Sequence, residues 1–205
     1  MPAPRPTAAI MAALPLLAAA AALLWPTAEV AAQGQQPAPQ RIDEFQSWTA
    51  ASQAEGGQKV CYAFTRATRS EGVPNRAANT VLLVVTHRPK ERDQVALQAG
   101  YAYPRGPEGG DAVQVLVGGR SVGFFTSGSS AFARDGKAAV AALRNGREAV
   151  ARGPLPNGGG GRGQASDSFS LAGFSAAYDA ISRECPAPAR APASAPPAQP
   201  PPARR

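Results

Sequence analysis

The chain has 205 residues, of which 44% are hydrophobic and 17% charged, and its formal net charge is +7 at pH 7. Three of the positive charges, Arg190, Arg204 and Arg205, lie at the C-terminal end, and the other basic residues are dispersed among acidic ones. Because a nucleic-acid-binding surface needs clustered basic residues, this distribution argues against nucleic acid as a partner.

Residues 1–32 have the pattern of a signal peptide. Arg5 precedes a nearly continuous apolar run, Ala8 to Trp25, and a small-residue site follows at residues 30–32. Cleavage there would leave Gln33 as the new N-terminus. The alternative is a membrane anchor, since about 18 apolar residues are close to the length that spans a bilayer. No segment beyond Gln33 is long and apolar enough to span a membrane.

The two ends of the mature chain differ in composition from its middle. Residues 33–41 form a polar, Pro-containing flexible lead, and residues 186–205 form a Pro/Ala-rich tail without large apolar side chains. Such a tail is predicted to be disordered. Residues 42–185 are enough for one domain with a hydrophobic core.

Short apolar segments separated by Gly, Pro and Asn predict many strands in this domain. Gly118-Gly119 separates two alternating segments and predicts a hairpin. Residues 80–86 are apolar on both faces and predict a central strand that is covered on each side. The predicted strands are Phe45 to Ala50, Lys59 to Thr65, Thr80 to Thr86, Gln94 to Ala99, Ala112 to Val117, Ser121 to Thr126 and Glu148 to Arg152.

Two helices are predicted late in the domain. Asp135 can cap the first, from Gly136 to Arg144, with Gly146 just beyond its end. In the second, apolar residues recur at steps of three or four over residues 171–185, and Ser170 is the expected cap. The predicted fold is therefore mainly β, an antiparallel β-sandwich or strongly curved antiparallel sheets with one short helix midway and one C-terminal helix. The predicted core comprises Trp48, Tyr62, Phe64, Leu82, Val84, Val95, Leu97, Val115, Phe124, Leu143, Phe174, Tyr178 and Ile181.

The chain has two cysteines, Cys61 in a predicted strand and Cys185 at the end of the second predicted helix. Both point into apolar surroundings, which favours one buried disulfide that fastens this helix to the sheet. Closing so long a loop would contribute roughly 4 to 5 kcal/mol in the chain-entropy description. The alternatives are two free thiols or a catalytic cysteine.

The sequence predicts no catalytic, cofactor-binding or metal-binding residues, no cofactor, and no enzymatic activity. The lone His87 is expected to be structural, and Gly158 to Gly163 lacks the ending of a phosphate-binding loop. The one enzymatic alternative is a periplasmic hydrolase or inhibitor that uses the Ser127 to Ser130 loop with His87 nearby.

Four segments carry a resemblance to a known family: Trp48-Thr49, Lys59 to Tyr62, Phe132 to Ala151 and Phe169 to Tyr178. With them, residues 42–185 resemble the invasion-associated locus B family of exported bacterial proteins. Members with additional cysteines have them near Phe124-Phe125, where this chain has Thr126 and Ser127, so a second disulfide is not available here. The resemblance implies a periplasmic, secreted or outer-membrane-associated β-rich domain, and it transfers no catalytic or ligand residues.

Our leading expectation is a non-enzymatic binding or structural protein of the cell envelope, with a role in host-cell invasion or envelope integrity. Its partner would be an envelope or host-surface component that the sequence does not identify, and the oligomeric state is not predicted. Besides the hydrolase, the alternative is a chaperone-like or adhesin-like module that binds through an uncovered, uncharged strand edge.

Overall fold

The computed structural model describes residues 38–105, 112–156 and 163–188, which lie within one compact unit of the chain. The predicted signal peptide lies outside the described residues, as does nearly all of the predicted tail. The strands are β1 (Gln40–Phe45), β2 (Trp48–Glu55), β3 (Gln58–Arg66), β4 (Arg69–Glu71), β5 (Leu82–His87), β6 (Gln94–Gln98), β7 (Val113–Val117), β8 (Arg120–Ser127), β9 (Ser130–Ala133), β10 (Glu148–Pro154) and β11 (Gln164–Ser170). The helices are a 3-10 turn (Ala78–Thr80), α1 (Gly136–Asn145) and α2 (Phe174–Glu184).

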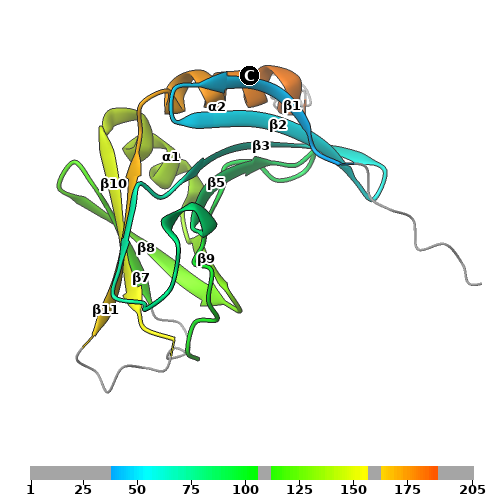
Figure 1. Ribbon diagram of the computed structural model, residues 1–205. Coiled ribbons are helices and arrows are strands. Elements are labelled where there is room, and N and C mark those ends of the chain that lie inside the picture. The colour runs from blue at the N-terminus through cyan, green and yellow to red at the C-terminus, as the bar shows by residue number, and fades with distance from the viewer. Residues whose placement is uncertain (1–37, 106–111, 157–162, 189–205) are drawn as a thin grey trace, which may run out of the picture. The chain divides into compact units, whose positions relative to one another are not determined.

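All described strands belong to one antiparallel sheet in the order β1-β2-β3-β5-β6-β9-β8-β7-β10-β11-β4. The sheet curves strongly because β3 and β4 are nearly continuous in the chain but lie at different places in this order. The Ala67 amide donates to Val81 beside β5, and the next amide, Thr68, donates to Ser168 of β11. The chain therefore crosses from one neighbour to the other within two residues (Figure 1). This confirms the mainly β, antiparallel fold, here as one curved sheet.

The predicted glycine hairpin is confirmed. Gly118 and Gly119 have φ values of 55° and 81°, and Val117 pairs with Arg120 across the turn. Two successive positive φ values are typical of the hairpin turn whose twist matches that of its strands.

The prediction of one strand from Phe45 to Ala50 is wrong, because the chain turns between β1 and β2 within that segment. Phe45 pairs with Trp48, and Gln46 adopts a φ of 54° without being a glycine. No Gly, Asn or Pro marks the turn. Strands β4, β9 and β11 were missed as well. In β11 a buried Asp167 interrupts the apolar alternation.

Helix α1 confirms its prediction, since the Asp135 side chain accepts a hydrogen bond from the Ala138 amide. Helix α2 begins later than predicted. Ser170 is the last residue of β11, and Gly173, with a φ of 91°, takes the cap position in place of Ser170. A Cβ at Gly173 would lie 1.9 Å from the Phe45 carbonyl oxygen, so the close approach of β1 requires glycine there.

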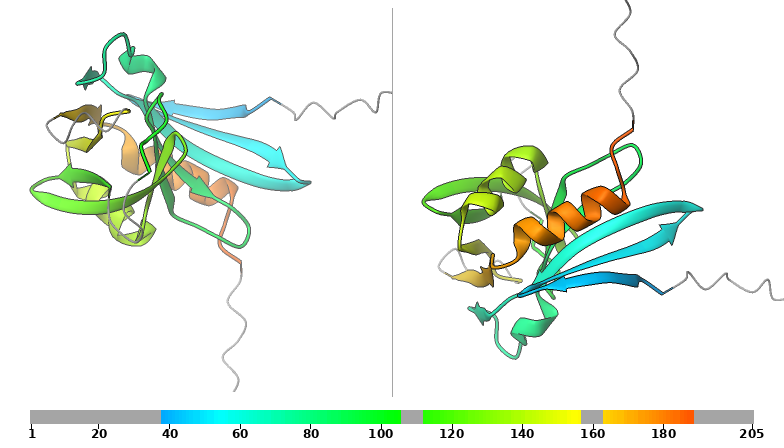
Figure 2. Two further views of the ribbon diagram at one scale, coloured as in Figure 1. Left: turned by 90° about the horizontal axis from the view of Figure 1, so that it is seen from below. Right: turned by 90° about the horizontal axis from the view of Figure 1, so that it is seen from above.

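One face of the sheet forms the core with both described helices. Helix α2 lies across β1, β2 and β3 (Figures 1 and 2). Its Phe174 ring packs against Trp48 with 4.7 Å between the ring centroids. Most of the predicted core is confirmed, and Tyr178 packs against it half-buried, but four further residues are half-buried and lie on the opposite face: Tyr62, Phe64, Leu82 and Val84. The helices cover the other face, so the expectation that the strand at residues 80–86 is covered on each side is wrong.

The predicted disulfide is confirmed. Cys61 and Cys185 are bonded with their Cα atoms 6.0 Å apart, across a separation of 124 residues. Cys61 is fully buried in β3, and Cys185 directly follows α2. The bond therefore fastens the end of α2 to the middle of the sheet.

Candidate functional site: the open face of the sheet

The strand register aligns a row of apolar side chains on the sheet face that the helices leave uncovered, which we call the open face. Phe64 pairs with Val84, Val84 with Ala96, Ala96 with Phe132, and Phe132 with Phe125. The row crosses five neighbouring strands, β3, β5, β6, β9 and β8. At the usual strand spacing it is about 19 Å long.

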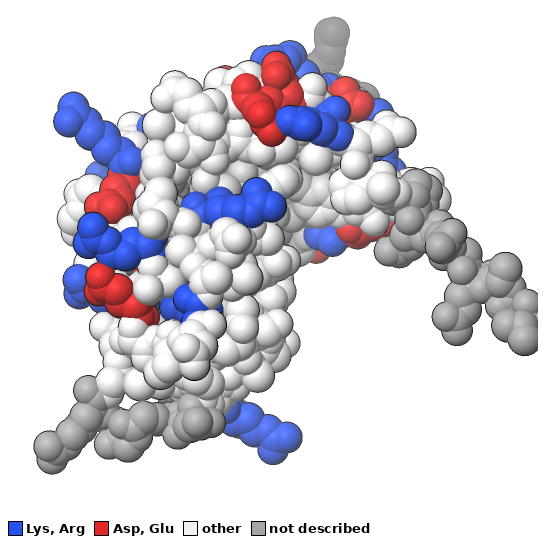
Figure 3. Space-filling view, viewed as in Figure 1, with Lys and Arg blue, Asp and Glu red and all other residues white. Residues whose placement is uncertain are grey.

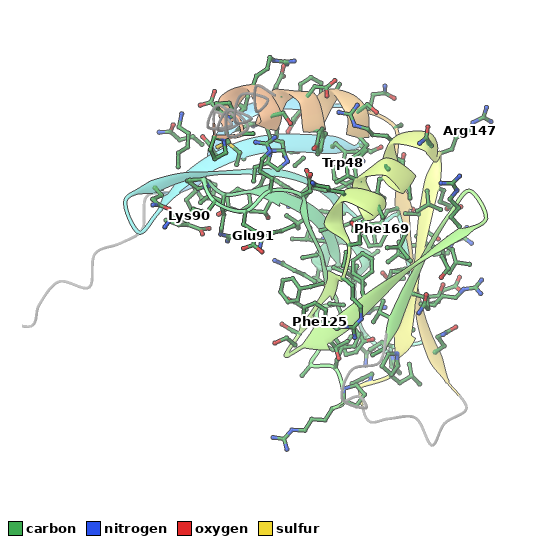
Figure 4. All side chains as sticks on the ribbon, turned by 180° about the vertical axis from the view of Figure 1, so that it is seen from behind. Trp48, Lys90, Glu91, Phe125, Arg147 and Phe169 are labelled. Carbon is green, nitrogen blue, oxygen red and sulfur yellow. A yellow bond between two sulfur atoms is a disulfide. The ribbon has the colours of Figure 1, made fainter. Side chains whose placement is uncertain are left out.

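The residues next to this row along the same strands all point into the core. Ala63, Val85, Val95, Ala131 and Phe124 are each no more than 2% exposed. The row itself is half-buried or exposed, and Phe125 is 39% exposed. Figure 4 labels Phe125 and shows it on the hollow side of the bent sheet. Successive side chains of a strand alternate between faces, so one curved sheet carries a buried and an open apolar surface.

Part of the open face forms a groove of about 510 Å³. Its floor is Ala51, Tyr62, Phe64, Leu82 and Val84. Figure 3 shows blue and red side chains mixed over the visible face of the molecule and not gathered by sign. The size is within the range of small-molecule sites, which are commonly apolar with a few polar groups.

The two ends of the groove differ in their polar groups. At one end, the Tyr62 hydroxyl donates to Glu55, and Glu55 also forms an ion pair with Arg88 at 3.0 Å. Arg88 donates in turn to Gln94, so this end is a satisfied polar network. At the other end Arg66 lies opposite Leu82, is exposed, and makes no ion pair with any described residue.

A second hollow of about 270 Å³ adjoins Arg66 and is rich in hydroxyl groups. Thr65 donates to the Ser47 carbonyl at 2.6 Å, and Thr68 donates to the Ser168 carbonyl at 3.1 Å. The hydroxyls of Ser47 and Thr49 make no hydrogen bond to the part of the chain that the structure describes. The surface thus changes from apolar to polar along the line from Val84 to Ser47.

His87, the one histidine of the chain, is fully buried beneath α2. Its Nε2 lies 3.1 Å from a carboxylate oxygen of Asp93, which also accepts a hydrogen bond of 2.5 Å from the Tyr178 hydroxyl. Burial lowers the pKa of His87, the Arg92 charge lowers it further, and the Asp93 hydrogen bond partly opposes both. This geometry indicates a neutral, structural histidine that joins β5 to α2.

The structure does not bring His87 and the Ser127 to Ser130 loop together. Thr86, next to His87, pairs with Gln94 at one end of β6, whereas Ser130 pairs with Gln98 at the other. At the rise of a strand these two ends of β6 are about 14 Å apart. General-base assistance needs a heavy-atom distance of about 2.6 to 3.2 Å, so these residues form no catalytic pair.

The free edge of the sheet at β1 is charged. Arg41, Asp43 and Glu44 lie along it, and the register shifts between Arg41 and Asp43 as in a β-bulge. Charges and bulges are the features that keep edge strands from pairing with other chains. The uncharged edge that strand-edge binding would show is therefore not found at β1.

A buried ion pair was not anticipated from the sequence. Arg76 makes two hydrogen bonds to Asp167, at 2.7 and 3.1 Å, and both side chains are 4% exposed. The Tyr101 ring lies 5.1 Å from the Arg76 guanidinium, and burial raises the pKa of Tyr101 to about 12. The pair joins the loop after β4 to β11 and has a structural role.

Among the described residues, no group of three or more His, Cys, Asp or Glu side chains could hold a metal ion. No helix in the same part of the chain is long and apolar enough to cross a membrane.

These features define a class of protein: a mainly-β domain whose C-terminal helix is fastened by one disulfide and whose sheet has an open apolar face. The profile of the invasion associated locus B (IalB) protein family matches residues 48–182. The chain belongs to this family, which confirms the resemblance predicted from the sequence.

One solved structure is similar to the chain, the crystal structure of invasion associated protein b from Bartonella henselae. The two sequences are 21% identical, with a TM-score of 0.44, and the match covers 69% of this chain and 95% of that one. No curated protein matches the chain.

Proposed function

We propose that this chain is an exported, non-enzymatic binding protein of the cell envelope and that its ligand lies on the open face. The observation that supports this most directly is the apolar row from Phe64 to Phe125, which both described helices leave uncovered. Exposed contiguous apolar surfaces of folded proteins commonly mark binding sites.

The disulfide supports a location outside the cytoplasm, since such bonds persist in oxidising compartments. With the signal peptide predicted for residues 1–32, we place the protein in the periplasm, at the outer membrane or outside the cell. The description of its family names invasion. A contribution to host-cell invasion or to envelope integrity is the biological role that we propose for the binding.

The separation of His87 from the Ser127 to Ser130 loop supports binding without catalysis. The buried polar groups are also arranged for structure. His87 bridges two elements under α2, and Arg76 is held by Asp167. Neither cluster lines the groove.

The proposal is tested by recovering components of envelope extracts on the immobilised oxidised domain, with proteins, glycans and lipids identified by mass spectrometry. Val84→Glu and Ala96→Glu place a charge in the middle of the apolar row, where both side chains are half-buried and near solvent. We expect each substitution to abolish the specific enrichment that the wild-type domain shows.

Gln164→Glu is the matched control, since it adds the same charge at an exposed position of β11. It should retain the component at the wild-type level. Circular dichroism and thermal midpoints would show that all variants are folded. Enrichment that survives both open-face substitutions, or no enrichment at all, would contradict the proposal.

A further inference from the structure

We propose that the ligand of the open face is a free long-chain fatty acid, with its hydrocarbon chain in the groove over Phe64 and Val84 and its carboxylate at Arg66. This inference rests on the proposed function and specifies its ligand. It is carried by the juxtaposition of an apolar floor with Arg66 at one end of it, a cation that makes no ion pair in the described part of the chain.

The floor of the groove favours a hydrocarbon over a polypeptide. The backbone N–H and C=O groups of β3 and β5 are directed along the sheet in ladder hydrogen bonds with their neighbouring strands. An extended peptide lying across this face would find no partners for its own backbone groups, which are costly to leave unsatisfied. An alkyl chain has no such groups, and it would gain from contact with Tyr62, Phe64 and Val84.

The charges around the groove favour one anionic group and indicate where it lies. Glu55 is neutralised by Arg88 at the Tyr62 end, and Glu44 is paired with Arg41 along the rim. Arg66 remains without an ion pair among the described residues. Its guanidinium can donate two parallel hydrogen bonds to a carboxylate, and the hydroxyls of Ser47 and Thr49 line the adjoining hollow.

The rim of the groove favours a free fatty acid over a lipid that remains in a membrane. Arg41 and Glu44 are 63% and 59% exposed and form an ion pair at the groove, and Arg66 is exposed as well. Inserting this rim into the hydrocarbon of a bilayer would remove these charges from water at high cost. A volume of about 510 Å³ suits one ligand of small-molecule size.

The test is calorimetric titration of the oxidised wild-type protein with palmitate below its micellar concentration, in parallel with hexadecanol, which has the same chain length and no charge. We expect saturable binding of one palmitate. Arg66→Gln should weaken palmitate binding about tenfold, the effect of losing a charge-assisted hydrogen bond, and leave hexadecanol binding unchanged. Arg152→Gln, an exposed arginine of β10 outside the groove, is the matched control and should bind palmitate like the wild type.

Each other outcome overturns the inference in a recognisable way. If Arg66→Gln and Arg152→Gln bind palmitate with equal affinity, the carboxylate does not lie at Arg66. Binding to phosphatidylglycerol vesicles without binding to monomeric palmitate would assign the face to a membrane lipid. If palmitate does not bind but Val84→Glu still abolishes recovery of an envelope component, the fatty acid is wrong and the proposed function stands; if both tests are negative, both fail.

Discussion

At the scale of single residues, His87 is the group whose protonation should affect stability. It is fully buried, and its pKa is lowered from the usual 6.5 mainly because burial disfavours the imidazolium. In the unfolded chain the same histidine would titrate near 6.5. The unfolded state therefore binds the proton more readily than the folded state does, so protonation favours unfolding.

We predict that the free energy of unfolding is highest above pH 6.5 and falls as the pH decreases from there toward the lower folded-state pKa of His87. One such group gives a slope of at most about 1.4 kcal/mol per pH unit. Urea unfolding between pH 5 and 8 measures this. His87→Gln should be less stable at neutral pH and should lose this part of the pH dependence. An identical slope in both proteins would assign the dependence to other groups.

Single residues also explain why the open face was mistaken for core. Phe64 and Val84 are apolar and occupy strands, and those local properties are the same for a residue that faces a helix and for one that faces solvent. Glu55 is paired with Arg88, which is distant in the sequence, whereas Arg66 makes no ion pair with any described residue. Only the register of β2, β3 and β5 places them at opposite ends of one groove.

At the scale of elements, the start of α2 depends on a close contact with β1. Gly173 has a left-handed backbone, and a Cβ there would lie 1.9 Å from the Phe45 carbonyl oxygen. This contact aligns the first turn of α2 with the β1–β2 hairpin. Gly118 in the β7–β8 turn also has a positive φ, 55°, but a Cβ there would meet nothing within 4 Å.

These two glycines give a matched pair of substitutions. Gly118→Ala should cost about 1 kcal/mol of stability, because only the left-handed conformation is penalised. Gly173→Ala should cost clearly more, since the backbone of β1 or α2 must also shift. Equilibrium unfolding in urea compares them. Equal losses for the two variants would show that the contact with Phe45 is easily relaxed.

The elements also differ in how readily they were predicted. The predictions of the Gly118-Gly119 hairpin and of α1 were correct because their signals are local. The hairpin is marked by two adjacent glycines, and α1 by Asp135, whose side chain accepts a hydrogen bond from the amide three residues later. The β1–β2 turn was missed because Gln46 adopts a positive φ without being a residue type that usually marks it. The late start of α2 follows from a contact with a distant strand, which the local pattern of Ser170 and Leu171 cannot reveal.

At the scale of the whole molecule, the disulfide is the connection that holds α2 to the sheet at its C-terminal end. It joins residues separated by 124 positions. Beside it, Lys59 pairs with Glu184 at 2.5 Å, and Arg92 donates to the Cys185 carbonyl. Phe174 and Trp48 pack the first turn of the helix, so α2 is attached to the sheet at both ends.

We predict that the double substitution Cys61→Ala and Cys185→Ala lowers the thermal midpoint under oxidising conditions. The free energy of unfolding should fall by up to about 4 to 5 kcal/mol, because the unfolded chain without the bond has more conformational entropy. The packing of Trp48 on Phe174, at the other end of α2, should keep the fold intact at room temperature. Reduction with dithiothreitol should lower the midpoint of the wild type and leave that of the double variant unchanged. A midpoint that is insensitive to both treatments would mean that the bond does not contribute to stability.

The sequence by itself determined the mainly-β composition, most strands, both helices, the disulfide and the family, because each depends on local periodicity, turn residues or the count of cysteines. The tertiary structure decided which side of the sheet the helices cover. That choice depends on the strand order and on the crossing of Ala67 and Thr68 from β5 to β11. An apolar strand is compatible with burial on either face or on both. In the folded protein the two described helices pack on one face, so the row from Phe64 to Phe125 on the other face stays uncovered, with Arg66 at the end of its groove.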